Sequence, residues 1–360
     1  MDRRHLLAAG TAGTLAGAVG GRAASAQAEV RWNMVMPWPK TTPGLGLNAA
    51  RFAELVETMS AGRIRITVYG AGELVPPFEC LDAVQQGTAD LAHGTPYFWA
   101  GKSAALHYFT TTPFGLTAEE LAGWLYQGDG MKLWREVYDD FGVIPFYAGN
   151  SRTQAGGWFN QEITSVDDLR GLKIRIAGLG GEVLRRLGAN TVLIAPGEIA
   201  PSLMAGTVDA AEWVGPWNDR AFGLYEAATY YYVPAFHEPG PGLEIIVNRE
   251  SFAALGDDLK AIVETAATAI ATETVADFTF NNIMSYEPLL AQGIELRTWP
   301  DDVVDALGRE TKKVMADLAA TDELTGRIAR SLDDYLAKAD RYAQDFDQRL
   351  LQMRTRALMA

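Results

Sequence analysis

The chain has 360 residues, and its 31 lysines and arginines against 45 aspartates and glutamates give a formal net charge of −14. This excess of acid argues against a nucleic-acid-binding protein, because phosphate contacts need clustered cations. Hydrophobic residues make up 48% of the chain and aromatic residues 10%, which is enough for packed cores and too much for a disordered acidic chain. At roughly 150 residues per domain, the length favours about two domains.

The first 28 residues have the pattern of a secretory signal peptide. Arg3 and Arg4 precede an uncharged run rich in Ala, Gly and Leu, and the segment closes with a small-x-small cleavage pattern, Ala-Gln-Ala, at residue 28. The run is too short and too rich in glycine for an anchor, and nothing downstream approaches the ~20 apolar residues that a membrane helix needs. We therefore expect an exported protein, which leaves the cytoplasm by the general or the twin-arginine route. The single cysteine, Cys80, cannot form an internal disulfide.

Strand and helix patterns alternate along most of the chain. Val30, Trp32 and Met34 occupy alternate positions and predict a strand, and Pro37, with two further prolines, forces a loop after it. The pattern continues with a helix at 52–59, a strand at 64–68, a helix at 79–86, a short strand near 91, a helical stretch at 119–140 and a strand at 143–147. It resumes with a strand at 173–176, a helix at 182–187, a strand at 192–194, a helix at 198–205 and a strand at 208–212. Such alternation is typical of sheets built by crossover connections, so we expect two α/β lobes.

The C-terminal part of the chain has few prolines and long helical stretches at 257–284 and 301–319. In the final stretch, apolar residues recur every three or four positions, at Ile328, Leu332, Tyr335, Ala339, Tyr342, Phe346, Leu350 and Met353. This spacing predicts one apolar stripe on a long helix. The stripe can pack onto its own lobe or onto a second copy of the chain, and periodicity alone does not choose.

Familiar catalytic patterns fail in the exported part of the chain. Its histidines, His93, His107 and His237, lack the i, i+4 spacing of zinc ligands on one helical turn. A phosphate-loop pattern fails because Pro96 stands where a glycine is required, and the glycine pattern at 44–49 is a short match that gives little support to a dinucleotide site in an exported protein. No Gly-x-Ser-x-Gly sequence is present. We therefore expect a solute-binding protein, with its ligand between the lobes, rather than an enzyme.

Four segments together resemble one family. They are Gly-Arg-Ile-Arg-Ile-Thr-Val-Tyr-Gly-Ala-Gly-Glu-Leu at 62–74, Asp-Ala-Val-Gln-Gln-Gly-Thr-Ala-Asp at 82–90, Asp-Leu-Arg-Gly-Leu-Lys-Ile-Arg at 168–175, which is the most diagnostic, and Ala-Gly-Thr-Val-Asp-Ala-Ala-Glu-Trp at 205–213. They resemble the DctP-type extracytoplasmic solute receptors of tripartite ATP-independent periplasmic (TRAP) transporters. The similarity covers essentially the whole exported chain. It implies a receptor that passes its ligand to the membrane subunits of a transporter.

Segments 154–159, 212–216 and 230–234, with Glu238 after them, resemble the 2-oxo acid-binding, TakP-like branch of this family. That branch implies a small monocarboxylate held with a metal ion, in two hinge-connected α/β lobes that close on the ligand. The expected lobes are residues 29–150 with about 239–282, and residues 151–238 with about 283–322. Residues 323–360 form a helical extension similar to the one that makes some members dimers, so a homodimer is expected.

The resemblance assigns Arg175 as the clamp for the ligand carboxylate. A planar guanidinium can form two parallel charge-assisted hydrogen bonds with a carboxylate, although a strand arginine with apolar neighbours can equally make a surface salt bridge. The resemblance also assigns the metal ligands, which are the side chains of Gln154, Glu212 and Glu238 and the backbone carbonyl of Trp213. Oxygen donors of this kind suit a hard cation, and sodium and calcium both fit. From the residues alone, Glu212 could instead pair with a lysine, and Glu238 could be a solvated loop residue.

Tyr97 and Phe98 match an aromatic segment that lines the ligand pocket in this branch, although aromatics at a strand end are commonly core residues. Asn150 matches a polar position near the clamp, and Gln154 also faces the substrate. The surroundings of Glu238, with His237 before it, depart from those of the branch, which leaves the shape of the tail-side pocket open. The leading hypothesis is a receptor for a 2-oxo or 2-hydroxy monocarboxylate such as pyruvate, 2-oxobutyrate or lactate. The alternatives are a receptor for a larger or aromatic carboxylate and an extracytoplasmic enzyme that uses Glu212 or Glu238 as a base.

Overall fold

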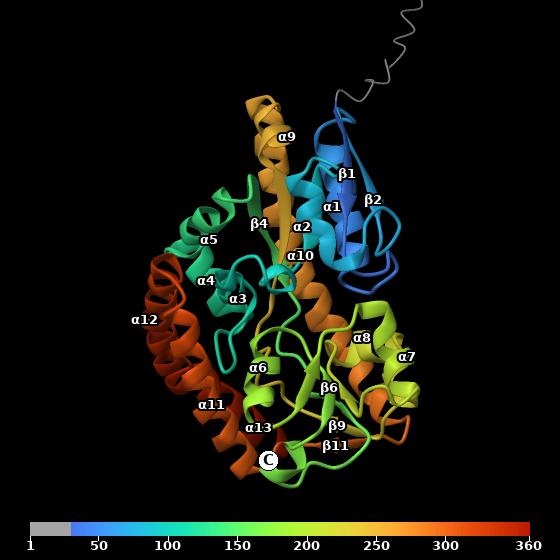
Figure 1. The fold of residues 1–360 in the computed structure, drawn as a ribbon, viewed down its shortest axis with the longest axis vertical. Helices are drawn as coiled ribbons and strands as arrows, with labels where there is room; N and C mark the ends of the chain where they lie inside the picture. The colour runs from blue at the N-terminus through green and yellow to red at the C-terminus, as the bar shows by residue number, and fades with distance from the viewer. Residues whose placement is uncertain (1–29) are drawn as a thin grey trace, which may run out of the picture.

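The computed structural model describes residues 30–360, and the predicted signal peptide at 1–28 lies outside this range. No helix in residues 30–360 combines the length and the apolar composition that a membrane crossing requires. Figure 1 shows two groups of strands, one in the upper and one in the lower half of the molecule, with the C-terminal helices along one side. The predicted alternation of strands and helices is therefore distributed over two sheets.

The first sheet has the strand order β2-β1-β3-β10-β4. Its strands are β1 (Val30–Val35), β2 (Ile64–Tyr69), β3 (Leu91–Gly94), β4 (Val143–Asn150) and β10 (Gly242–Asn248). Strands β1, β2 and β3 are parallel, whereas β10 runs antiparallel between β3 and β4. Because β10 follows the strands of the second sheet in sequence, the chain leaves the first sheet after β4 and returns to it before β10.

The second sheet has the strand order β11-β9-β5-β8-β6-β7. Its strands are β5 (Gly157–Phe159), β6 (Lys173–Arg175), β7 (Asn190–Val192), β8 (Ala210–Ala211), β9 (Tyr230–Tyr232) and β11 (Glu295–Arg297). Strand β6 is parallel to both β7 and β8, so the carboxyl-terminal ends of β6 and β8 lie at the same edge of the sheet. This edge carries Arg175 and the residue that follows β8.

Helices cover the sheets and connect the two halves. Those before the C-terminal region are α1 (Gly46–Met59), α2 (Cys80–Gln85), α3 (His107–Thr110), α4 (Ala118–Gln127), α5 (Gly130–Asp139), α6 (Gly178–Arg186), α7 (Ile199–Met204), α8 (Pro216–Ala221) and α9 (Arg249–Ala253). Helix α10 (Asp257–Leu290) packs against β4 and α1 of the upper half and against α8 of the lower half, as its course in Figure 1 shows. The helical stretch expected at 119–140 is two helices, because the extended backbone of Gly128 ends α4.

The C-terminal helices are α11 (Asp301–Ala319), α12 (Glu323–Asp345) and α13 (Asp347–Met359), with only Phe346 between the last two. The predicted apolar stripe divides along its length. Ile328 and Leu332 are buried against the body of the molecule, whereas Phe346 is 59% exposed and Leu350 63% exposed. The first half of the stripe therefore packs onto its own chain, and the second half is solvent-facing within residues 30–360.

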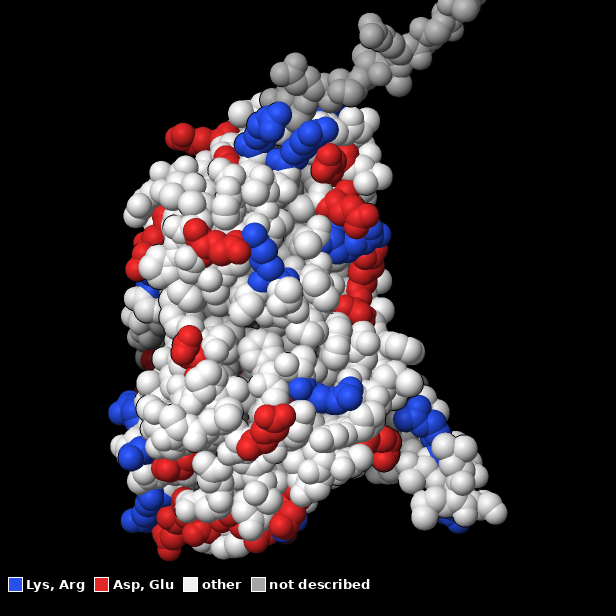
Figure 2. All heavy atoms as spheres, turned by 90° about the vertical axis from the view of Figure 1, so that its right-hand side faces the viewer, with Lys and Arg blue, Asp and Glu red and all other residues white. Residues whose placement is uncertain are grey.

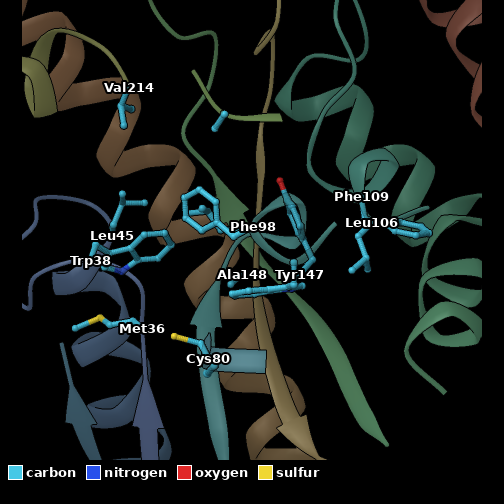
Figure 3. Packing of buried hydrophobic residues seen from close by; sticks show 14 of the residues in the cluster. Met36, Trp38, Leu45, Cys80, Phe98, Leu106, Phe109, Tyr147, Ala148 and Val214 are labelled. Carbon is cyan, nitrogen blue, oxygen red and sulfur yellow. The ribbon is translucent and has the colours of Figure 1, made fainter. Parts of the chain in front are cut away.

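One continuous group of buried apolar side chains runs through both halves. Figure 3 shows part of it in the upper half, where Trp38, Leu45 and Phe98 lie close together and Val214 of the lower half stands above them. The ring centroids of Trp38 and Phe98 are 6.5 Å apart. On the face shown in Figure 2, basic and acidic side chains are interspersed among uncharged atoms. The packed aromatic group at the junction of the halves forms one wall of the site described next.

Candidate functional site

A buried ion pair between Arg175 and Glu212 lies at one edge of the second sheet. Strands β6 and β8 place Arg175 opposite Ala211, so Glu212 comes one residue beyond that partner. Both side chains are 1% exposed, and Nη1 of Arg175 donates to Oε1 of Glu212 over 2.5 Å and to the Glu212 carbonyl over 2.7 Å. Nε donates to the Ile194 carbonyl, and within residues 30–360 Nη2 makes no hydrogen bond. The Nη2 amino group is thus left for another acceptor.

Two segments that cross between the sheets bring further polar side chains to this pair. The segment between β4 and β5 carries Gln154, and the segment between β9 and β10 carries His237 and Glu238. The Gln154 N–H donates to the Glu238 carbonyl over 3.1 Å, and the Ala235 N–H donates to the Gln154 carbonyl over 2.9 Å, which holds the segments side by side. One ligand atom each from Glu212, His237 and Glu238 lies within 4.8 Å of the others, and all three residues are buried.

Several polar atoms around this pair lack hydrogen-bond partners in the described part of the chain. They are Oε1 of Gln154, Oε2 of Glu212, both carboxyl oxygens of Glu238 and both ring nitrogens of His237. A buried polar group without a partner costs about 1–3 kcal/mol. A bound cation would satisfy the oxygens, since two carboxylates and an amide are the ligands that sodium and calcium prefer. The residues present therefore fit a hard cation.

Burial and neighbouring charges separate the two glutamates electrostatically. Burial raises the pKa of Glu238 well above its usual value, and the Glu212 carboxylate beside it raises the pKa further. Burial also opposes ionisation of Glu212, but the Arg175 guanidinium and His237 outweigh it and hold the pKa of Glu212 below its usual value. Glu212 is the ionised member of the cluster. A cation next to Glu238 would favour ionisation of that carboxyl as well.

A small cavity of about 20 Å³ lies at the junction of the two halves. It is lined by Trp38, Leu45, Thr95, Tyr97, Phe98, Ser151, Gln154, Trp213, Val214, Pro241 and Leu243. The cavity adjoins the charged cluster at Tyr97. The pKa of Tyr97 is raised by its burial and further by the nearby Glu238 and Glu212 carboxylates. The volume corresponds to roughly one water molecule. A small organic ligand would enter this space only with movement of its walls.

The family model of the bacterial extracellular solute-binding proteins of family 7, DctP, matches residues 34–322. The chain belongs to this family. This is a family of solute-binding receptors and not a family of enzymes.

Relatives of the receptor carry more specific names and ligands. A protein from Nostoc sp. named monocarboxylate 2-oxoacid-binding periplasmic protein is 41% identical over 293 residues, which are 81% of this chain and 80% of the Nostoc protein. The structure of a TRAP solute-binding protein from Bordetella bronchiseptica, a mixed-occupancy dimer with copurified calcium and picolinate, has a TM-score of 0.90 at 31% identity and covers 92% of this chain and 99% of that chain. A TRAP periplasmic solute-binding protein from Pseudoalteromonas atlantica with bound sodium and pyruvate has a TM-score of 0.87 at 34% identity. The match covers 90% of this chain and 98% of the Pseudoalteromonas chain. The predicted TRAP receptor family, its two-lobed fold and its periplasmic location are confirmed.

The aromatic wall of the receptor is fixed by a buried acid. Tyr97 and Phe98 lie on a short 3₁₀ turn, Pro96–Trp99, that follows β3. Glu244 of β10 is fully buried and accepts hydrogen bonds from the Trp99 indole N–H and the Tyr138 hydroxyl, each over 2.9 Å. Burial raises the pKa of Glu244 to about 8. The turn is thereby tied to β10 and, through Tyr138, to α5.

Asp219 of α8 fixes the opposite wall in the same way. Its carboxylate is fully buried and accepts hydrogen bonds from the Trp158 indole over 3.0 Å, the Tyr231 hydroxyl over 2.9 Å and the Val214 N–H over 3.1 Å. Val214 directly follows Trp213, whose ring centroid lies 5.7 Å from the guanidinium carbon of Arg175. Burial raises the pKa of Asp219 to about 7, with a further contribution from Glu212.

The predicted site residues fall into three places. Arg175, Glu212 and Glu238 meet in the charged cluster, and the cavity walls include Tyr97, Phe98, Gln154 and Trp213. Asn150 lies outside both groups: its Nδ2 donates to the Gly240 carbonyl over 2.8 Å, and its Oδ1 accepts from the Arg152 N–H over 2.7 Å. Because the backbone uses both ends of its amide, the ligand-binding role of Asn150 has no support from these contacts and stays a prediction.

Sequence reasoning missed three residues that shape the site. His237 enters the sequence analysis as a histidine without zinc-ligand spacing and as a departure from the family pattern, although its position next to Glu238 in a proline-rich loop is a usable signal. Glu244 is a lone acid among the apolar residues of β10 (Gly242–Asn248), and such a residue needs buried partners. Nothing in the local sequence of Asp219 pointed to its role, because its partners come from three separate elements.

Proposed function

We propose that the receptor binds a small 2-oxo or 2-hydroxy monocarboxylate together with a sodium or calcium ion and delivers it to the membrane subunits of a TRAP transporter. The observation that carries the proposal is the group of buried, unpartnered oxygens beside the Arg175–Glu212 pair. The 2-oxoacid specificity in the name of the Nostoc protein and the sodium and pyruvate in the Pseudoalteromonas protein support the same ligand class.

The proposed metal ligands are the side-chain oxygens of Gln154, Glu212 and Glu238 and the backbone carbonyl of Trp213. The ion would supply a positive centre for the carboxylate and the 2-oxo or 2-hydroxy oxygen of the ligand. Arg175 neutralises the ligand carboxylate through Nη2, because its other nitrogens already donate to Glu212 and Ile194. This assignment narrows the expected two-bond clamp to one amino group of the guanidinium.

Tyr97 and Phe98 are the proposed contacts of the ligand's carbon chain. Both line the cavity, and Tyr97 packs over Gly178 of α6, where an added Cβ would lie 3.0 Å from the Tyr97 ring. This contact joins the aromatic turn to the other half of the molecule, so it forms only when the walls are together. A short alkyl tail such as the methyl group of pyruvate suits a space of this size.

A larger or aromatic monocarboxylate is the second candidate ligand. The calcium and picolinate in the Bordetella protein favour it, since picolinate presents a carboxylate and a ring nitrogen to a metal in the way that pyruvate presents two oxygens. The small cavity of this receptor favours the smaller acid. We propose that neither ligand is chemically changed, and incubation of the receptor with these acids should yield no product by mass spectrometry.

We also propose that the two lobes comprise residues 29–150 with about 239–282 and residues 151–238 with about 283–322, in line with the division of the strands between the sheets. The receptor is proposed to be a homodimer through residues 323–360. The exposed apolar side chains of α13 and the dimeric Bordetella protein support this arrangement.

The ligand proposal is tested by calorimetric titration of the mature chain with pyruvate, 2-oxobutyrate, lactate and picolinate. Each titration is run as purified, after chelation, and in sodium-free buffer with and without added calcium. We expect binding of the 2-oxo acids only when a cation is present. Absence of binding by all four acids would refute the ligand class, whereas binding untouched by cation removal would refute only the metal.

The dimer is tested by light scattering of the full mature chain and of a chain ending at Asp345. This cut removes α13 and spares the buried residues Ile328 and Leu332 of α12. We expect a dimer for the full chain and a folded monomer for the shorter one. An unchanged mass after the cut would place the interface elsewhere.

A further inference from the structure

Ser151 is a buried serine of the cavity wall whose hydroxyl proton has no acceptor in the described part of the chain. The residue is 2% exposed and lines the cavity together with Gln154. Its oxygen accepts a hydrogen bond from Nε2 of Gln154 over 2.8 Å, and within residues 30–360 this is the hydrogen bond that its side chain makes. A hydroxyl group also carries one proton to donate. The wall of the cavity therefore presents a donor for a group that enters it.

The backbone fixes Ser151 and Gln154 in their places on the segment between β4 and β5. Arg152, which follows Ser151, has a left-handed backbone with a φ of 67°, a conformation that few residues other than glycine adopt. Its N–H donates to Oδ1 of Asn150 over 2.7 Å, which holds the chain in this bend. The Ser151 N–H donates to the Pro241 carbonyl of the second crossing segment over 3.4 Å. The two side chains are therefore held at a defined separation beside the charged cluster.

The contact with Ser151 determines which end of the Gln154 amide is free. With Nε2 on the serine, Oε1 is buried and has no partner within residues 30–360. An amide oxygen binds a hard cation, whereas the NH2 group carries only donors and repels one. The serine oxygen can accept from Nε2, but the serine proton can equally be donated to Oε1 if the amide is turned over. The orientation that suits a cation is thus fixed only when the Ser151 proton has another acceptor.

We propose that Ser151 donates its proton to an oxygen of the bound carboxylate ligand and thereby turns the Gln154 oxygen toward the cation. When the ligand takes the proton, the lone pairs of the serine oxygen face Nε2 of Gln154, and Oε1 is left for the cation. Ser151 is then both a contact of the ligand and a positioning residue for a metal ligand. The inference rests on the proposed function and adds a coupling to it, because ligand and cation each strengthen the binding of the other through this hydrogen-bond chain.

The experiment uses the full mature receptor and measures the coupling between calcium and pyruvate. Calorimetry gives the calcium dissociation constant without pyruvate and at saturating pyruvate, and the ratio of the two is the coupling factor. Ser151→Ala removes the hydroxyl group and Ser151→Thr retains it. Ser151→Cys, which keeps the size but is a weak donor, replaces the alanine variant if that variant does not fold. The matched control is Ser331→Ala, since the Ser331 hydroxyl of α12 accepts one hydrogen bond from the Trp124 indole over 3.1 Å.

We expect the coupling factor of Ser151→Ala to be about tenfold smaller than that of the wild type, because a hydrogen bond to a charged ligand is lost. Ser151→Thr and Ser331→Ala should stay within about twofold of the wild type. In a Gln154→Glu background, Ser151→Ala should also change the coupling factor by less than about twofold, because a carboxylate presents an oxygen in either orientation. An equal loss with Gln and with Glu at this position would overturn the positioning role.

Infrared difference spectra of bound pyruvate give a second readout, which does not depend on the stability of the receptor. The calcium-loaded receptor binds pyruvate labelled with ¹³C at the carboxylate or at the 2-oxo carbon, and a hydrogen bond shifts the stretching band of the oxygen that accepts it. One of the two bands should move in Ser151→Ala and stay in place in Ser151→Thr. A wild type that binds calcium and pyruvate, with the same coupling factor and the same bands in Ser151→Ala, would overturn the role of Ser151 alone. A wild type that binds neither would refute the proposed function.

Discussion

Two pairs of buried acids stand within the same region of the receptor and differ in their partners. Glu244 and Asp219 are fully buried, and each accepts hydrogen bonds from indole, hydroxyl or backbone donors. Glu212 and Glu238 are equally buried, but one oxygen of Glu212 and both oxygens of Glu238 have no partner in residues 30–360. Burial of a carboxyl group is common to all four and does not by itself identify a binding residue.

The difference lies in what completes each acid. Donors from the receptor itself complete Glu244 and Asp219, which therefore act as anchors for the Tyr97 turn and the Trp213 loop. The remaining oxygen of Glu212 and both oxygens of Glu238 have no donor in residues 30–360, and under the proposed function a bound cation would offset their desolvation. Substitutions that remove one member of each kind should separate these roles.

Arg175→Ala should have the largest effect. Loss of the guanidinium removes the positive charge for the ligand and leaves Glu212 unpaired, which costs about 3–5 kcal/mol for a buried pair. Arg175→Lys retains a charge but lacks the planar fork, so it should fold and still lose pyruvate affinity about 100-fold or more. Calorimetry and thermal unfolding measure both effects.

The matched control for Arg175 is Arg186→Ala. Arg186 pairs with Glu182 and with Asp317 of α11, each over 2.8 Å, and surface pairs of this kind contribute little to stability. It should leave ligand binding unchanged. Wild-type pyruvate affinity in Arg175→Lys would contradict the clamp.

Glu238→Gln should lower the affinity for the cation by about 10–100-fold, because the substitution removes the negative charge of one ligand while keeping the shape of its side chain. In chelator the variant should be at least as stable as the wild type, since burial and Glu212 already raise the pKa of Glu238 and disfavour its charged form. Calcium titration and thermal unfolding in chelator test the two halves of this expectation. Equal calcium affinity in variant and wild type would remove Glu238 from the metal site.

Asp219→Asn should lower pyruvate affinity by about 10-fold through the Trp213 loop, without removing any metal ligand. The oxygen of the new asparagine amide can accept a hydrogen bond from the Val214 N–H. Its NH2 group, however, would face the donor groups of Trp158 and Tyr231, so we expect the loop that carries Trp213 to shift. The measurement is the pyruvate dissociation constant at saturating calcium, alongside the unfolding temperature. A lower unfolding temperature with unchanged affinity would assign Asp219 to stability alone.

Glu244→Gln should have the smallest effect on binding and a pH-dependent effect on stability. The pKa of Glu244 is raised to about 8 in the fold, above its ordinary value of 4.5, so the folded state holds this proton more tightly than the unfolded state. Its contribution to stability is therefore complete below about pH 4.5 and is lost as the pH rises toward about 8. The stability of the wild type relative to Glu244→Gln should fall over that interval in chemical unfolding, and a difference that stays constant with pH would contradict this account.

Local patterns predicted much of the molecule. The order of strands and helices followed from apolar periodicity, which also placed Arg175 on a strand and Glu212 at the end of another. Where the pattern was incomplete, a local cause was responsible: Gly128 divides the helical stretch at 119–140, and the apolar stripe does not show which of its residues the body covers.

The sequence by itself determined the family, the alternation of elements and the export pattern, and it singled out the residues that are proposed for the site. Only the tertiary structure decided that Arg175 is buried against Glu212, 37 positions away, rather than paired at the surface, and that His237 joins the same cluster. Those contacts depend on which strands are neighbours and on how two crossing segments pair. Sheet order and register arise from packing of the whole chain, so no local spacing records them.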